Sequence, residues 1–131
     1  MKLEQIYEQI YEQIDNQLLK LSYNIKDLFD ITHNEIEDDL QSGYIFSINI
    51  RINNLYNDSM DILIIISEKI LIDAKNKLTS LITNIYELIA IYFEIKKYIN
   101  NFVRISILSI DSDINSLYYN TLTYVNKYAL N

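Results

Sequence analysis

The chain has 131 residues, a length typical of a single domain, and carries a net charge of −7 at neutral pH. It contains no cysteine, no proline and a single glycine, which excludes disulfides, thiolate metal sites and cysteine nucleophiles and disfavours an all-β fold rich in turns. We therefore expect one all-α domain over residues 1–131, a four-helix bundle of long helices in which one helix could be broken or kinked.

The charge is unevenly distributed along the chain. Residues 1–61 carry 12 acids against 4 bases, a net charge of −8, whereas residues 62–131 carry 6 acids against 7 bases, a net charge of +1. This asymmetry can align copies head to tail or steer a partner, and it is equally what solubility requires. Because no uncharged run reaches 18 residues and no basic segment precedes an apolar one at the start, we expect neither a transmembrane span nor a signal peptide.

The first helix is predicted from an apolar stripe whose spacing averages about 3.6 residues, the α-helical period. A long coiled coil would favour 3.5 residues, so the repeated phrase EQIYEQIYEQI indicates one wall of a bundle. Glu4, Glu8 and Glu12 form a row expected to face solvent. The stripe consists of Leu3, Ile6, Ile10, Ile14, Leu18, Leu21, Ile25 and Leu28.

A capping box at Thr32 and Glu35, with Ile31 able to contact Ile36, predicts that the first helix ends near Asp30 and that a second begins at His33. This second helix is less clear, because isoleucines alternate with polar residues over 48–53 as in a strand and Ser42-Gly43 could break it. We prefer a helix, since a lone strand would have no partner for its backbone.

A turn at 57–59 is predicted to precede a long third helix from Met60 to Ile99, with a potential break at 73–77. Its segment 85–95 is apolar nearly all round, as in a helix buried on several faces, so we expect it at the centre of the fold.

The last helix is predicted over about 103–129, after a junction within 101–113. It carries two apolar rows, an arc wider than one core requires, and one row is expected to face another subunit. The rows are Ile114, Leu117, Thr121, Tyr124 and Tyr128, and beside them Tyr118, Leu122, Val125 and Ala129.

No catalytic, cofactor-binding or metal-binding residue is predicted. The single histidine supports neither a Ser-His-Asp relay nor a di-iron site, and no glycine-rich phosphate loop is present. We expect that the protein is not an enzyme and that it uses no cofactor or small-molecule substrate.

Tyrosine and lysine supply the candidate binding residues. Tyrosine tolerates wet and dry surroundings and is enriched at protein interfaces. Cations in the second half could form a basic patch in weak contact with DNA, although the overall acidity counts against strong binding. The self-association candidates are Tyr7, Tyr11, Tyr118, Tyr119, Tyr124 and Tyr128, and the basic-patch candidates are Lys69, Lys75, Lys77, Lys96, Lys97 and Arg104.

The Tyr-Glu-Gln-Ile phrases of residues 7–14, the richness in isoleucine, asparagine and tyrosine, the missing cysteine and proline and the length together resemble the major virion (coat) proteins of two-tailed, spindle-shaped archaeal viruses. The resemblance implies a four-helix-bundle coat protein of hot, acidic surroundings that packs with copies of itself around the genome. The expected location is then the virion, and the host cytoplasm before assembly. A small helical module that binds a host protein, or a DNA-binding regulator, remains the alternative.

Overall fold

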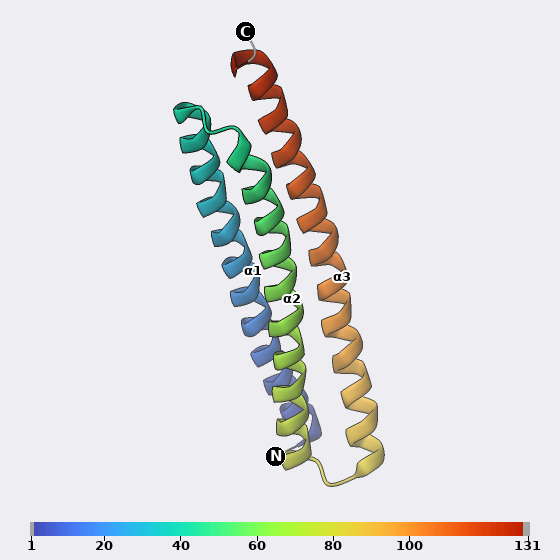
Figure 1. Cartoon of the computed structure of the whole chain (residues 1–131). Helices are drawn as coiled ribbons and strands as arrows, with labels where there is room; N and C mark the ends of the chain where they lie inside the picture. The colour runs from blue at the N-terminus through green and yellow to red at the C-terminus, as the bar shows by residue number, and fades with distance from the viewer. Residues whose placement is uncertain (1, 130–131) are drawn as a thin grey trace.

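The computed structural model describes residues 2–129, and side chains for residues 2–127. Three long helices, α1 (Leu3–Ser42), α2 (Phe46–Leu81) and α3 (Ile85–Tyr124), are followed by one π-helical turn, η1 (Val125–Ala129). The helices lie side by side, with α2 antiparallel to both α1 and α3 (Figure 1). The all-α prediction is confirmed, and the prediction of four helices is wrong: residues 2–129 form three long helices and no strand.

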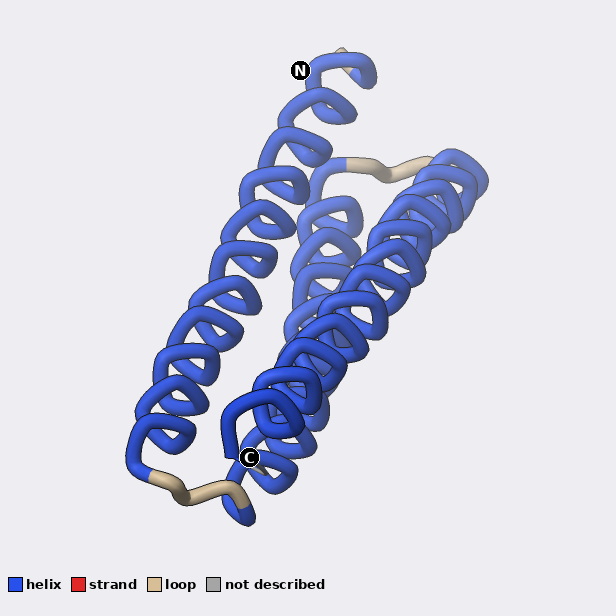
Figure 2. The backbone as a smooth tube through the Cα atoms, turned by 90° about the horizontal axis from the view of Figure 1, so that it is seen from above, coloured by secondary structure: helices blue, strands red, loops and turns tan. Residues whose placement is uncertain are grey.

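α2 is the helix that packs closely against both others, while α1 and α3 approach one another less (Figure 2). Its buried residues recur every three or four positions, so one continuous face of α2 lies in the core. Three of them are small, which leaves room for larger side chains from α1 and α3 to interdigitate. The buried residues of α2 are Ile48, Ile52, Leu55, Ser59, Leu63, Ser67, Ile70, Ala74 and Leu78.

The core runs along the whole bundle in three clusters. One cluster at the end near the α2–α3 loop contains Ile10, Leu78 and Ile95, a middle cluster contains Leu63, and a cluster at the other end contains Ile36 and Leu117. The stripe predicted for the first helix is confirmed from Ile6 to Ile25, all of whose members are buried. Glu4, Glu8 and Glu12 are exposed, as predicted.

The predicted helix boundary at Thr32 is wrong, because α1 continues without interruption to Ser42. Phe29, Thr32 and Ile36 are partly or fully buried at helical spacing, so Thr32 occupies a core-facing position inside the helix. The Glu35 carboxylate does not return to Thr32 but contacts Arg51 of α2. A tertiary contact has therefore replaced the local cap.

The predicted turn at 57–59, the potential break at 73–77 and the junction at 101–113 also lie inside continuous helices. In each segment the polar residues that suggested a turn lie mostly on the solvent side, while Ser59, Ala74 and Ile110 stay in the core. Helix continues through these segments because their buried positions keep the helical period.

The actual loops lie at 43–45 and 82–84. Gly43 ends α1 with a φ of 79°, a left-handed conformation that glycine adopts without steric cost, and the Tyr44 amide donates to the Asp39 carbonyl at 2.9 Å. Asn84 caps α3, since its Oδ1 accepts from the amides of Tyr86 at 3.0 Å and Glu87 at 3.3 Å. Ser42-Gly43 thus breaks the predicted second helix, whereas the helical interpretation of 48–53 is confirmed.

Replacing the Asn84 cap tests whether the helix boundaries lie where the structure has them or where the sequence predicted them. Asn84→Ala should lower the free energy of unfolding by about 1 kcal/mol, because two amides lose their acceptor. Thr32→Ala, the matched control, should change it by less than about 0.5 kcal/mol, since Thr32 caps no helix and the higher helix propensity of alanine offsets the loss of a partly buried methyl group. Urea titration followed by circular dichroism measures both, and a larger effect at Thr32 would contradict the uninterrupted α1.

Candidate functional site

The amino-terminal part of α3 is not at the centre of the fold, contrary to the prediction for segment 85–95. Only Ile91 and Ile95 are buried there, whereas Tyr86 is 83% exposed and Phe93 is 60% exposed. In a bundle of three helices each helix needs one buried face, so a helix that is apolar all round keeps apolar side chains in water. Sequence reasoning missed these residues because it took apolar character as a sign of burial.

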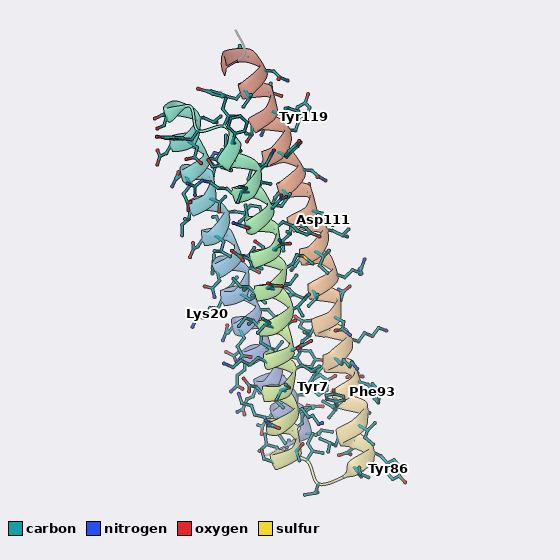
Figure 3. All side chains as sticks on the ribbon, viewed as in Figure 1. Tyr7, Lys20, Tyr86, Phe93, Asp111 and Tyr119 are labelled. Atoms are coloured by element: carbon teal, nitrogen blue, oxygen red, sulfur yellow. The ribbon has the colours of Figure 1, made fainter. Side chains whose placement is uncertain are left out.

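The exposed apolar side chains of α3 form a first candidate surface, here called the α3 surface. It lies on the face of α3 that points away from its buried residues, with an apolar group near each end of the helix. Tyr86 and Tyr119 mark these two ends, and Phe93 and Asp111 lie between them along the helix (Figure 3). The large apolar residues of the α3 surface are Tyr86, Ile89, Phe93, Leu108, Tyr119 and Leu122, all exposed.

A second candidate surface, here called the α1–α2 surface, lies where α1 and α2 meet on another side of the bundle. Ile31, Ile65 and Ile72 are 56%, 62% and 56% exposed. Ile31 and Ile65, together with Leu28, Ile62 and Ile66, line a mostly apolar groove between the two helices. Exposed apolar patches of this kind mark interaction sites on proteins.

The predicted tyrosines Tyr7 and Tyr11 form contacts within the chain. Their rings stack with centroids 4.9 Å apart, and Tyr11 meets Tyr98 edge to face at 5.2 Å. The Tyr7 hydroxyl donates to Glu94 and the Tyr98 hydroxyl donates to Asp15, so these side chains join α1 to α3. The hydrogen bond to Asp15 raises the pKa of Tyr98, and burial is the main cause that raises the pKa of Tyr11.

The other predicted tyrosines are spread around the far end of α3. Tyr119, 69% exposed, belongs to the α3 surface. Tyr118 lines a groove between α2 and α3, and Tyr124 lines another between α1 and α3. The side chain of Tyr128 lies outside the described residues. The structure therefore places the six candidates at several distinct positions.

The predicted basic residues lie on α2 and α3 but point in different directions. Lys77 donates to Gln13 of α1, whereas the Lys75 ammonium lies 5.8 Å from the centroid of the Tyr92 ring on α3. Arg104 donates to Asn101 at 2.9 Å. Lys69, Lys96 and Lys97 are exposed. Lys75 and Lys77 thus flank α2 on its two sides.

A polar cluster that sequence reasoning missed ties α1 to α2 near the α1–α2 loop. Arg51 of α2 donates to both Asp39 and Glu35 of α1, and the Ser47 hydroxyl donates to Asp39 at 2.8 Å. Hydrogen bonds from Arg51 and Ser47 hold the pKa of the buried Asp39 carboxyl below its usual range, while partial burial opposes them. Spacing along the chain gave no signal for this cluster, because the turn at Gly43 creates it.

Among residues 2–129, no group of acidic or histidine side chains is arranged to hold a metal ion. No helix in the described part of the chain is long and apolar enough to cross a membrane. Comparison with protein-family profiles, curated proteins and solved structures finds no match. The described residues expose the α3 surface and the α1–α2 surface, and outside them further large apolar side chains such as Phe46, 96% exposed, and Ile50, 62% exposed.

The Asp39–Arg51 contact should make the stability of the bundle sensitive to acid. Because the pKa of Asp39 is lower in the folded than in the unfolded chain, the stabilisation is complete above the unfolded value of about 3.9 and is lost as pH falls through the folded value. Asp39→Asn should therefore destabilise the protein at pH 7, and its effect should shrink progressively as pH falls below about 3.9. Urea unfolding at several pH values measures this.

Asp38→Asn is the control for that experiment, since Asp38 is the exposed neighbour on the same helix. Equal pH profiles for the two variants would show that Arg51 does not hold Asp39 in its ionised form.

Proposed function

We propose that the chain is a self-assembling structural subunit that serves as a major virion protein. The observation that supports self-assembly is the presence of two separate exposed apolar surfaces, the α3 surface and the α1–α2 surface, on a bundle that already has a continuous core. Water contact with rings such as Tyr86, Phe93 and Tyr119 is unfavourable, and burial against another protein removes it.

The number of separate apolar surfaces decides whether an assembly closes or continues to grow. A single self-complementary patch produces a closed dimer, whereas a subunit with two separate patches can contact two different neighbours and continue to grow. The bundle is also long, because helices of 40 residues extend for about 60 Å. Such rods offer extended sides for lateral packing, which suits a protein that forms a shell or sheet.

The virion role rests on the sequence resemblance to coat proteins of spindle-shaped archaeal viruses, and the three-helix architecture departs from the four helices that this resemblance implies.

A host-directed binding module would need one apolar surface, so the second surface favours self-assembly. Lys75 and Lys77 flank α2 on different sides. Lys97 and Arg104 share the outer face of α3, but they do so with Asp111 and several apolar residues, which gives little support to a DNA-binding regulator. Mass spectrometry of purified particles separates the roles, because a coat protein must be abundant there and a host-directed module or regulator must not.

Acid should strengthen association of the purified protein. Carboxyl groups in water lose their charge as pH falls through about 4, and α1 carries an exposed row at Glu4, Glu8 and Glu12 that repels the same row in other copies. We expect the mean particle mass from light scattering to rise between pH 7 and pH 3, with circular dichroism showing that the helices persist.

A triple variant with Glu4, Glu8 and Glu12 changed to Gln is the matched comparison for the acid titration. It should associate at pH 7 more strongly than the parent does, because it lacks the repulsion throughout. A monomer at every pH, in parent and variant alike, would contradict the proposed self-assembly.

The α1–α2 surface should be needed for growth beyond small oligomers. Ile65→Lys places a charge in its groove and should stop assembly without unfolding the bundle, since Ile65 is 62% exposed. Asn57→Lys, an exposed position on the same helix outside this groove, should assemble like the parent. Electron microscopy and sedimentation report the assembly size. Identical behaviour of the two variants would show that this surface is not a contact.

A further inference from the structure

We propose that the α3 surface binds the α3 surface of a second copy in an antiparallel arrangement with two-fold symmetry. The inference deepens the proposed self-assembly, on which it rests, by specifying one of its contacts. It is carried by the order of residues along the outer face of α3. From one end to the other, this stripe consists of Tyr86, Ile89, Phe93, Lys97, Asn100, Arg104, Leu108, Asp111, Asn115, Tyr119 and Leu122.

The stripe has the same spacing from either end. Its steps are 3, 4, 4, 3, 4, 4, 3, 4, 4 and 3 residues, with Arg104 at the midpoint. When two such helices cross antiparallel at Arg104, every stripe position meets a stripe position of the other helix. Tyr86 then faces the partner's Leu122, and Ile89 faces the partner's Tyr119. Tyr86 and Ile89 at one end of α3 therefore cover Leu122 and Tyr119 of the other copy. The same alignment places Phe93 opposite the partner's Asn115 and Leu108 opposite the partner's Asn100, so these two contacts are apolar against polar.

Charge complementarity supports the same alignment. Lys97 and Asp111 lie seven residues on either side of Arg104, so each Lys97 meets the partner's Asp111 and the dimer contains this pair twice. Within one chain the two residues are 14 positions apart, about 21 Å along a helix, which is too far for an ion pair. Neither forms an ion pair with another described residue of its own chain. The charges thus remain available for a second copy.

The sizes of the side chains also fit a shallow crossing. Long helices that pack side by side as in helical bundles cross at about 20°, so they are closest at the crossing point and diverge toward their ends. The stripe has its aromatic residues Tyr86, Phe93 and Tyr119 toward the ends, where they can fill the wider gap. The unfavourable element is Arg104, whose charge meets its own copy at the two-fold axis. Arg104→Gln should therefore lower the dissociation constant of the dimer several-fold.

Disulfide trapping tests the alignment directly, because the natural chain has no cysteine. Arg104→Cys should form a disulfide-linked dimer under mild oxidation, since its two copies meet at the axis. Asn115→Cys, on the same face, should not link to itself, because the two sulfurs would lie about 33 Å apart in the antiparallel dimer. Efficient linking of Asn115→Cys would indicate parallel helices and would overturn the inference.

Charge reversal tests the Lys97–Asp111 pair without oxidation. Lys97→Asp and Asp111→Lys should each raise the dissociation constant of the dimer about tenfold in analytical ultracentrifugation, because each places like charges together twice. The double variant, Lys97→Asp with Asp111→Lys, should recover the parent affinity. Lys20→Asp, an exposed position on α1, is the control and should leave the affinity unchanged.

The outcomes separate this inference from the proposed function. If the protein self-associates but Arg104→Cys does not link and the charge reversals have no effect, the α3 contact is wrong while self-assembly stands. If the parent chain is a monomer at high concentration, both are wrong. Linking of Arg104→Cys together with recovery in the double variant supports both.

Discussion

The structure depends on the uninterrupted buried face of α2. Because α2 packs against both other helices along its length, α1 and α3 are held in place largely through it, and each needs only the side that faces the core. Leu63 and Leu78, both fully buried, lie in the middle and at one end of this face. One consequence is that three helices, and not four, are enough to bury a continuous core. The other is that, among residues 2–127, nothing packs on the outer face of α3 that would require it to be apolar.

The helical class and the core face of the first helix follow from the sequence, since the 3.6-residue period is a property of the residues themselves. The helix boundaries do not follow in the same way, because a cap is decided by competition between local and tertiary contacts. Glu35 can complete a capping box with Thr32, yet in the fold its carboxylate contacts Arg51, 16 residues later in the chain. Ser59 likewise resembles a turn residue but lies fully buried in the α2 face.

The candidate surfaces are only partly visible in the sequence. An apolar segment such as 85–95 has the same sequence pattern whether its side chains are buried inside its own bundle or against another molecule. Only the number of helices that surround it in the fold distinguishes the two cases. Of the predicted self-association tyrosines, Tyr119 is exposed, whereas Tyr7 and Tyr11 join α1 to α3. The residues of the outward stripe of α3 can be read from the sequence. That they form one exposed face can be recognised only when the buried face of that helix is known.

Carboxylates of α1 occur in two different environments: Asp39 is buried and paired with a cation, whereas a row of glutamates is exposed to water. Asp39 is buried and held in its charged form by Arg51 and Ser47, so its contribution to the fold persists to a lower pH than an ordinary carboxylate allows. The row Glu4, Glu8 and Glu12 is exposed, and in the proposed assembly its negative charge opposes contact with the same row of another copy. The two groups lie on the same helix but act on different contacts, one between α1 and α2 and the other between the proposed neighbouring copies. If copies associate as proposed, the acid response of association and the acid response of stability therefore arise from different carboxylates of α1.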